Sequence, residues 1–142
     1  MYLDTCMAVK LYLPEAESDR LQKIVAGTGV LSCSEILISE FGSTLARKYR
    51  ERQLNRDLQN RVWNMFSAHL AAGYWNLIPL TRQDLFEARR LIWQCQDNAP
   101  LRTLDAIHLA ICRSYKVYPL CTMDRVMLQA AHFLNIPVRQ ID

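Results

Sequence analysis

Hydrophobic residues follow two alternating patterns along the chain. Longer stretches place apolar residues three and four positions apart, which predicts amphipathic helices, and short apolar runs between them predict strands. The expected strands lie at 2–3, 30–33, 76–80, 118–121 and 136–141. The expected helices lie at 7–13, 15–26, 34–51, 54–72, 81–95 and 125–134, with one more that begins near Thr103. This alternation predicts an α/β fold of three layers (α/β/α), in which helices cover both faces of a parallel sheet of about five strands.

Local signals mark several element ends. Ser34 is the expected N-cap of the helix at 34–51. Thr81 and Asp84 have the spacing of a capping box, and Asn135 is the expected left-handed residue after the last helix. The chain has no repeat, low-complexity tract or linker, so residues 1–142 are expected to form a single domain.

Composition narrows the class of protein. Apolar residues make up 51% of the chain, enough for one core, while the net charge of +3 is too small to indicate nucleic-acid binding by itself. The five cysteines include no C-x-x-C pair and are interpreted as reduced core thiols. The N-terminus lacks the pattern of a signal peptide, and no stretch approaches the roughly 20 apolar residues of a membrane span. A cytoplasmic protein without a membrane segment is therefore expected.

Four acidic residues stand out by position. Asp4 follows the first expected strand, Asp124 follows the fourth, and Asp105 lies in the first turn of the helix that leads into the fourth. All three are expected at the carboxyl edge of the sheet, where α/β proteins bind ligands. Glu40 lies on the apolar arc of its helix with Phe41, so its side chain is expected to point inward, whereas that of Glu35 is not.

Each acid also has a simpler explanation. Asp4 and Asp124 could be helix N-caps, and Asp105 could interact with a helix dipole. Glu40 could pair with Arg47 or Lys48. Taken together, however, three acids at one edge and one inward acid are better explained by a shared cation, and an all-carboxylate site suits Mg²⁺ or Mn²⁺.

Three neighbouring residues could support these acids. The hydroxyls of Thr5 and Thr122 lie beside them and could hold water or a phosphate oxygen, or could bond locally to the backbone. His108 lies one turn beyond Asp105 and could support that acid from behind or could be a histidine at the edge of the core.

The ordered set of acidic motifs resembles the PIN domain family. The resemblance rests on residues 2–12, 34–47, 101–110 and 122–124 and covers nearly the whole chain. It implies strand order 3-2-1-4-5 and a ribonuclease that depends on Mg²⁺ or Mn²⁺. The implied catalytic residues are Asp4, Glu40, Asp105 and Asp124, with the three aspartates as metal ligands. Cys6 departs from the family pattern, because many relatives carry a small polar residue or Asn there.

The chain is also similar to the single-domain PIN toxins of VapBC toxin–antitoxin pairs. That similarity implies a homodimer that cleaves RNA and is held inactive by a cognate antitoxin. A catalytically weak PIN-like module that binds RNA or a partner is the alternative. An α/β phosphotransferase with Asp4 as nucleophile is disfavoured, because Cys6 stands where a second acid would be needed.

A basic segment follows Glu40. Residues 47–61 include six basic residues and two acidic ones. The four nearest to Glu40 are candidate RNA contacts: Arg47, Lys48, Arg50 and Arg52. The segment could instead be a solvated face or an antitoxin contact.

Overall fold

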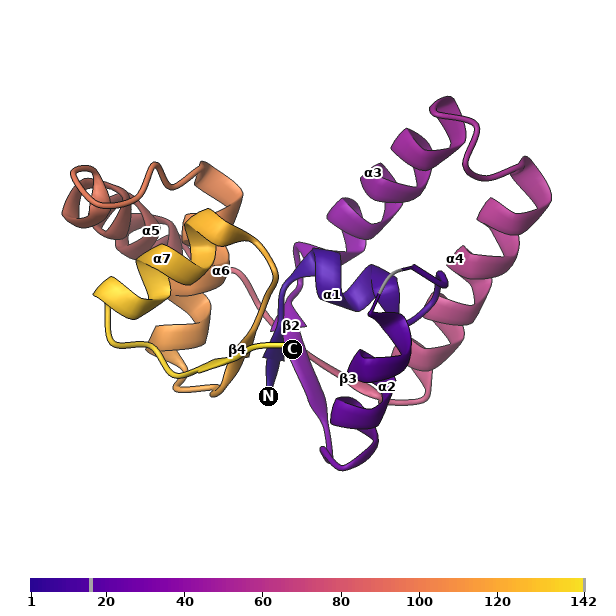
Figure 1. The fold of residues 1–142 in the computed structure, drawn as a ribbon, viewed down its shortest axis with the longest axis horizontal. Coiled ribbons are helices and arrows are strands. Elements are labelled where there is room, and N and C mark those ends of the chain that lie inside the picture. The colour runs from indigo at the N-terminus through magenta and orange to yellow at the C-terminus, as the bar shows by residue number, and fades with distance from the viewer. Residues whose placement is uncertain (16, 142) are drawn as a thin grey trace.

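The short apolar runs pair into one parallel sheet in the computed structural model of the protein, which describes residues 1–15 and 17–141 (Figure 1). The strands are β1 (Tyr2–Leu3), β2 (Leu31–Ser34), β3 (Trp75–Ile78), β4 (Leu120–Cys121) and β5 (Val138–Arg139). Their order, β3-β2-β1-β4-β5, confirms the expected topology. In register, Tyr2 lies between Ser32 of β2 and Leu120 of β4, so β1 is the central strand.

Seven helices enclose this sheet in the described part of the chain. They are α1 (Thr5–Lys10), α2 (Ser18–Ala26), α3 (Leu37–Arg50), α4 (Arg56–Ala71), α5 (Arg82–Cys95), α6 (Thr103–Ser114) and α7 (Arg125–Phe133). Figure 1 shows α1 to α4 on one side of the sheet and α5 to α7 on the other, with α3 and α4 extending together as an arm. The three-layer α/β/α prediction is therefore confirmed.

Several element ends differ from the sequence-based expectation. Helix α1 begins at Thr5 rather than at Met7, because the Asp4 carboxylate caps it by accepting the Met7 N–H at 2.8 Å. Ser34 is not a helix N-cap: it is the last residue of β2, paired with Ile78, and α3 begins only at Leu37. The helix predicted at 15–26 includes position 16, which lies outside the described residues.

Other end signals act as expected. Thr81 and Asp84 form a reciprocal capping box at the start of α5. Asn135 has φ +55°, as the left-handed residue after α7 should. The last strand is shorter than the run at 136–141, because only Val138 and Arg139 pair with β4.

Aromatic rings and helix α6 dominate the core. Phe41 stacks on Phe66 with ring centroids 4.1 Å apart, and Tyr12 meets both rings edge-on. Helix α6 is buried continuously from Ala106 to Cys112, so it is the central helix of its layer. Among the helices that the structure describes, none has the length and apolar character needed to cross a membrane.

The capping box yields a stability prediction. Thr81→Ala removes the side-chain oxygen that accepts the Asp84 N–H, so the free energy of unfolding should fall by about 1 kcal/mol. Urea unfolding followed by circular dichroism measures the change. Thr103→Ala is the matched control, because Thr103 is an exposed residue at the start of α6 where the N-cap is Arg102. The control should change the free energy by less than about 0.5 kcal/mol, and equal losses in both variants would contradict the capping argument.

Candidate active site

The sheet topology creates a crevice at the carboxyl ends of β1 and β4. The chain leaves β1 toward β2 and β3, then returns to the other side of β1 to form β4 and β5. Neighbouring parallel strands whose connections diverge in this way leave an opening beyond their carboxyl ends. Asp4 directly follows β1, and Thr122 and Asp124 follow β4, so the topology alone brings these residues to one place.

Asp4 joins the two central strands at this edge. Its carboxylate is buried, with 4% of the residue exposed. One oxygen, Oδ1, accepts the N–H of Met7 at 2.8 Å, and Oδ2 accepts the hydroxyl of Thr122. Burial raises the pKa of Asp4, and these two hydrogen bonds oppose the rise. Asp4 is thus a helix cap, as the simpler explanation proposed, and it also lines the crevice.

The other two aspartates come from the helices opposite. Asp124 is the N-cap of α7 and accepts the Met127 N–H at 2.8 Å. Asp105 lies in the first turn of α6 and lines the same cavity. Burial raises the pKa of Asp105, and the negative charge of Asp124 raises it further. The Asp124 carboxylate is therefore close enough to disfavour ionisation of Asp105.

Glu40 reaches the site from α3, on the other side of the sheet. Its Oε2 accepts the Thr5 hydroxyl and lies 2.8 Å from Nε2 of His108. Burial acts to raise the pKa of Glu40, but the hydrogen bond and charge of His108 lower it below its usual value. Pairing of Glu40 with Arg47 or Lys48, considered from the sequence, is not found; its partner is a histidine 68 positions away.

His108 is buried and held on both ring nitrogens. Nδ1 lies 2.8 Å from the Tyr2 hydroxyl, while Nε2 faces Glu40. Burial alone would lower the pKa of His108, but hydrogen bonds with Cys33 and Glu40 raise it to about 10. His108 contacts Glu40 and not Asp105, the acid that the sequence suggested it could support.

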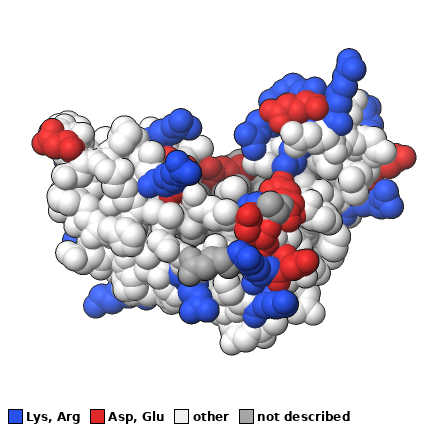
Figure 2. Space-filling model, in the orientation of Figure 1, with Lys and Arg blue, Asp and Glu red and all other residues white. Residues whose placement is uncertain are grey.

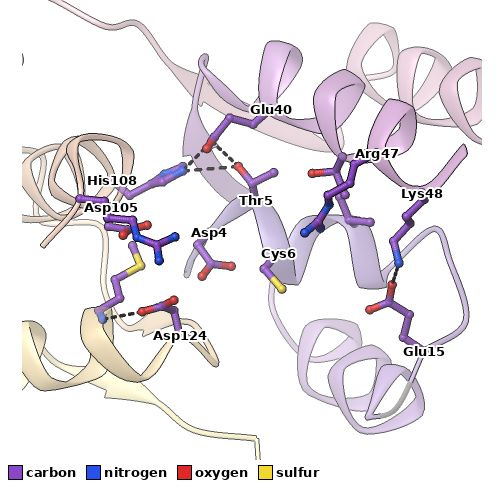
Figure 3. Close-up of a pocket in the computed structure, with 14 residues that line it drawn as sticks. Asp4, Thr5, Cys6, Glu15, Glu40, Arg47, Lys48, Asp105, His108 and Asp124 are labelled. Atoms are coloured by element: carbon purple, nitrogen blue, oxygen red, sulfur yellow. Dashed lines mark hydrogen bonds and ion pairs between the residues drawn. The ribbon is translucent and has the colours of Figure 1, made fainter. Parts of the chain in front are cut away.

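One cavity of about 390 Å³ contains all four acids. Figure 3 shows Asp4, Asp105 and Asp124 around a common space, with Glu40 at one side beside Thr5 and His108. Figure 2 shows acidic side chains in the hollow between the two halves of the molecule, with Lys and Arg on either side. The cavity is polar and open enough for a charged ligand to enter.

Basic residues form two walls of this cavity. Arg47 and Lys48 line it from α3, and Arg102 lines it from the start of α6. Lys48 also forms an ion pair with Glu15, which stands on the same wall (Figure 3). The acid cavity is thus flanked by cationic groups from both sides of the sheet.

Some candidate residues lie elsewhere. Arg50 and Arg52 line a separate shallow hollow at the end of α3, not the acid cavity. Thr122 does not line the cavity, but its hydroxyl donates to Asp4 and accepts the Asp124 N–H at 3.0 Å. Cys6 is exposed on the cavity wall, so the interpretation of all five cysteines as core thiols is wrong for this one; the other four are buried.

Sequence reasoning missed two residues. Arg102 could have been found, because the residue before a helix that carries Asp105 must lie at the same sheet edge. Tyr2 offered no such signal, because a tyrosine inside a short apolar run is expected to be core. Its hydroxyl contact with His108 depends on two segments 106 positions apart.

The donor set suits a hard cation. The oxygens of Asp4, Asp105 and Asp124 are ligands that Mg²⁺ and Mn²⁺ prefer. The raised pKa values of Asp4 and Asp105 show that the pocket resists further negative charge, which a cation would relieve. Within residues 1–15 and 17–141, no three His, Cys, Asp or Glu side chains already stand together as a metal-ligand group. The residues fit the ion in chemical type, and ligand closure around it would require side-chain adjustment.

Known proteins share this architecture. VapC20 of Mycobacterium tuberculosis, described as a toxin that cleaves the sarcin–ricin loop, superimposes with a TM-score of 0.70 at 14% identity, over 91% of this chain and 93% of that one. VapBC2 from Rickettsia felis, bound to a DNA fragment from its promoter, gives 0.68 at 12% identity, over 99% and 98%. A toxin–antitoxin complex from Klebsiella pneumoniae gives 0.58 at 20% identity, over 87% and 85%.

Sequence comparison assigns the family. None of the curated protein sequences compared with the chain matches it. The sequence model of the PIN domain, in contrast, matches residues 1–132, which include all four acids and the whole described sheet up to β4. This chain therefore belongs to the PIN domain family.

Proposed function

We propose that this protein is an endoribonuclease that depends on Mg²⁺ or Mn²⁺ and is the toxin of a toxin–antitoxin pair. The observation that carries the proposal is the gathering of Asp4, Glu40, Asp105 and Asp124 in one cavity at the topological switch point of the sheet. The toxins among its structural neighbours support the biological role, and VapC20 supports RNA as the substrate class.

The metal would be held by Asp4, Asp105 and Asp124. Such an ion, when bound, lowers the pKa of water and neutralises charge on a phosphodiester. Hydrogen bonds from the Met7 N–H and the Thr122 hydroxyl fix the Asp4 carboxylate in place. This orientation is supplied by the fold before any ligand binds.

Glu40 is the proposed general base. Its pKa is lowered, so it is ionised at neutral pH and able to accept a proton from the attacking water. Both observed contacts use Oε2, and Oε1 has no hydrogen-bond partner among the described residues. The second oxygen is thus available to the cavity.

The RNA backbone is proposed to cross the cavity between its two basic walls. Arg47 and Arg102 stand on opposite helices and can each bind a phosphate on one side of the scissile bond. Arg50 and Arg52 lie beyond this path, so we now assign the RNA contact to Arg47 and Arg102, with Lys48 shared between RNA and Glu15.

An antitoxin is the proposed protein partner. A cavity rich in carboxylates can be blocked by an Arg or Lys side chain of a partner, since a bidentate pair in a desolvated pocket is a strong contact. Exposed Phe86 and Trp93 on α5, with 59% and 62% of each residue exposed, support a protein interface on that layer. The homodimer and the cytoplasmic location remain predictions from the sequence.

A non-cleaving module that binds RNA or a partner is the second candidate. It is favoured by one observation, the lack of a ready-made metal-ligand group among the described residues. The two candidates differ in a cleavage assay, because a binding module would retain RNA affinity without any product in Mg²⁺ or Mn²⁺.

Loss of a carboxylate should abolish cleavage. Asp4→Asn and Asp105→Asn each remove negative charge from the proposed ion site, so the cleavage rate should fall by at least about 10²–10³-fold. Gel assays with mixed RNA in Mg²⁺ or Mn²⁺, with and without chelator, measure this effect.

The control for this assay is Glu35→Gln. Glu35 is exposed, and its Oε1 accepts the N–H of Leu80 at 2.8 Å, a bond that a glutamine oxygen can also make. Cleavage should stay within about twofold of the wild type. A loss as large as that of Glu40→Gln would contradict the assignment of Glu40 as the acid of the site.

Repulsion between the neighbouring carboxylates should lower the thermal stability of the wild type. The folded-state pKa of Asp105 is raised, so its ionised form destabilises the fold at pH 7, and this cost disappears below its unfolded pKa of about 3.9. Asp105→Asn should therefore have a higher Tm than the wild type in chelator at pH 7, with a gap that closes toward pH 4. Added Mn²⁺ should also narrow the gap, by stabilising only the wild type.

Asp97→Asn is the control for the stability experiment. Asp97 is exposed in the loop after α5, away from the cavity, so its variant should follow the wild-type Tm at every pH. A gap for Asp105→Asn that stays constant with pH would show that its origin is not the carboxylate charge.

RNA affinity should depend on Arg47. In an Asp105→Asn background, which prevents cleavage, Arg47→Gln should weaken RNA binding and lower the slope of log K against log salt by about 0.7. The Arg50→Gln, Arg52→Gln double variant removes two charges from the neighbouring hollow and should change the slope less. Titrations at three salt concentrations distinguish the two, and a larger effect of the double variant would place the RNA track along the tip of α3.

A further inference from the structure

A chain of hydrogen bonds runs from the sheet to Glu40. The Ser34 N–H, at the end of β2, donates to the Tyr2 hydroxyl at 3.1 Å. The Tyr2 hydroxyl lies 2.8 Å from Nδ1 of His108, and Nε2 of His108 lies 2.8 Å from Oε2 of Glu40. This series of hydrogen bonds thus links β2, β1, α6 and α3 in that order.

We propose that Tyr2 and His108 are positioning residues that hold the Glu40 carboxylate in its catalytic orientation. This inference rests on the proposed function, because it gives Glu40 the role of base. Neither residue lies on a loop or an edge: Tyr2 is fully buried, and only 3% of His108 is exposed. Of the two, only His108 reaches the cavity wall, so Tyr2 acts entirely through its neighbour.

The direction of the bonds favours this role in either protonation state of the histidine. If His108 is neutral, Nε2–H donates to Glu40 and Nδ1 accepts the Tyr2 hydroxyl proton. If His108 is charged, Nε2–H still donates to Glu40 and Nδ1–H donates to the Tyr2 oxygen. Glu40 receives a hydrogen bond in both cases, because the tyrosine hydroxyl can serve as donor or acceptor.

The result is a carboxylate fixed through one oxygen. Oε2 is held by His108 and by the Thr5 hydroxyl, which come from opposite sides of the sheet (Figure 3). Two donors on one oxygen restrict rotation of the carboxylate, and Oε1 has no hydrogen-bond partner among the described residues. Groups that orient a catalytic residue in this way commonly contribute about 10- to 100-fold to activity.

The network also satisfies polar groups at its two ends. Replacing Tyr2 and His108 by an apolar pair would deprive the Ser34 N–H and the Glu40 carboxylate of these partners. Buried hydrogen-bond networks are retained at a site when their geometry matters. The network ends on Glu40, which supports a function in orientation.

The test is Tyr2→Phe, which removes one oxygen and keeps the buried ring. We expect kcat for RNA cleavage to fall about 10- to 100-fold while KM stays within about twofold, because RNA binding does not involve Tyr2. Tyr12→Phe is a closely matched control. Tyr12 is also buried, and its hydroxyl bonds Nδ1 of His69 at 3.0 Å and accepts from Trp75 at 2.9 Å, outside the acid cavity. The control should lower stability without lowering kcat.

Two histidine variants extend the test. His108→Gln can place an amide N–H near the position of Nε2 and so donate to Glu40, whereas His108→Leu has similar volume and no donor. The expected order of kcat is wild type, then Gln, then Leu. A Leu variant as active as the Gln variant would overturn the proposal, and Tyr2→Phe decides the question if the Leu variant does not fold.

A measurement without RNA separates this inference from the proposed function. In chelator, ¹⁵N signals of the His108 ring and ¹³C signals of the Glu40 carboxylate should shift in Tyr2→Phe and remain unchanged in Tyr12→Phe. If the wild type cleaves no RNA, the proposed function fails. The Glu40 signal alone then tests whether Tyr2 acts on Glu40 through His108. Unchanged signals, equal losses of kcat in both tyrosine variants, or shifted signals with wild-type kcat in Tyr2→Phe would overturn the positioning role.

Discussion

The buried carboxylate of Asp4 is the interaction on which the site depends. It caps α1 through the Met7 N–H and accepts the hydroxyl of Thr122 beyond β4, so a single side chain sets the start of a helix and joins the ends of the two central strands. The same burial raises the pKa of Asp4, which means that the fold places a charge where the surroundings oppose it. A raised pKa of this kind is expected of a carboxylate whose negative charge a bound cation would neutralise.

The two halves of the molecule contribute different parts of the site. Asp105 and His108 lie one turn apart on α6; Asp105 faces Asp124, and His108 reaches across to Glu40. Glu40 belongs to the layer of α3, so its hydrogen bond with His108 crosses from one helical layer to the other. The cavity therefore exists only when both layers are packed on the sheet, and its geometry reports on their relative placement.

The sequence predicts the helices and strands that follow from hydrophobic periodicity. It does not predict contacts between residues that are distant along the chain. Asp4 and Asp124 could be placed because residues after parallel strands share an edge. Ser34 was assigned as a cap from its local context, but pairing with Ile78 extends β2 by that residue instead. The Glu40 partner was sought nearby in sequence, whereas His108 becomes a neighbour only through the fold. Cys6 is exposed because it lines the cavity, whereas the other residues of α1 are buried.

Helix α6 also constrains how this protein could diversify. Its first turns carry Asp105 and His108, and its body is buried from Ala106 to Cys112, so most of its positions are constrained by packing or by the site. The arm of α3 and α4 is different, since it extends from the body and presents many exposed polar residues (Figure 1). Descendants of one ancestral chain could thus vary the part of the arm beyond Arg47 and Lys48, while the residues of α3 that line the cavity stay fixed with those of α6.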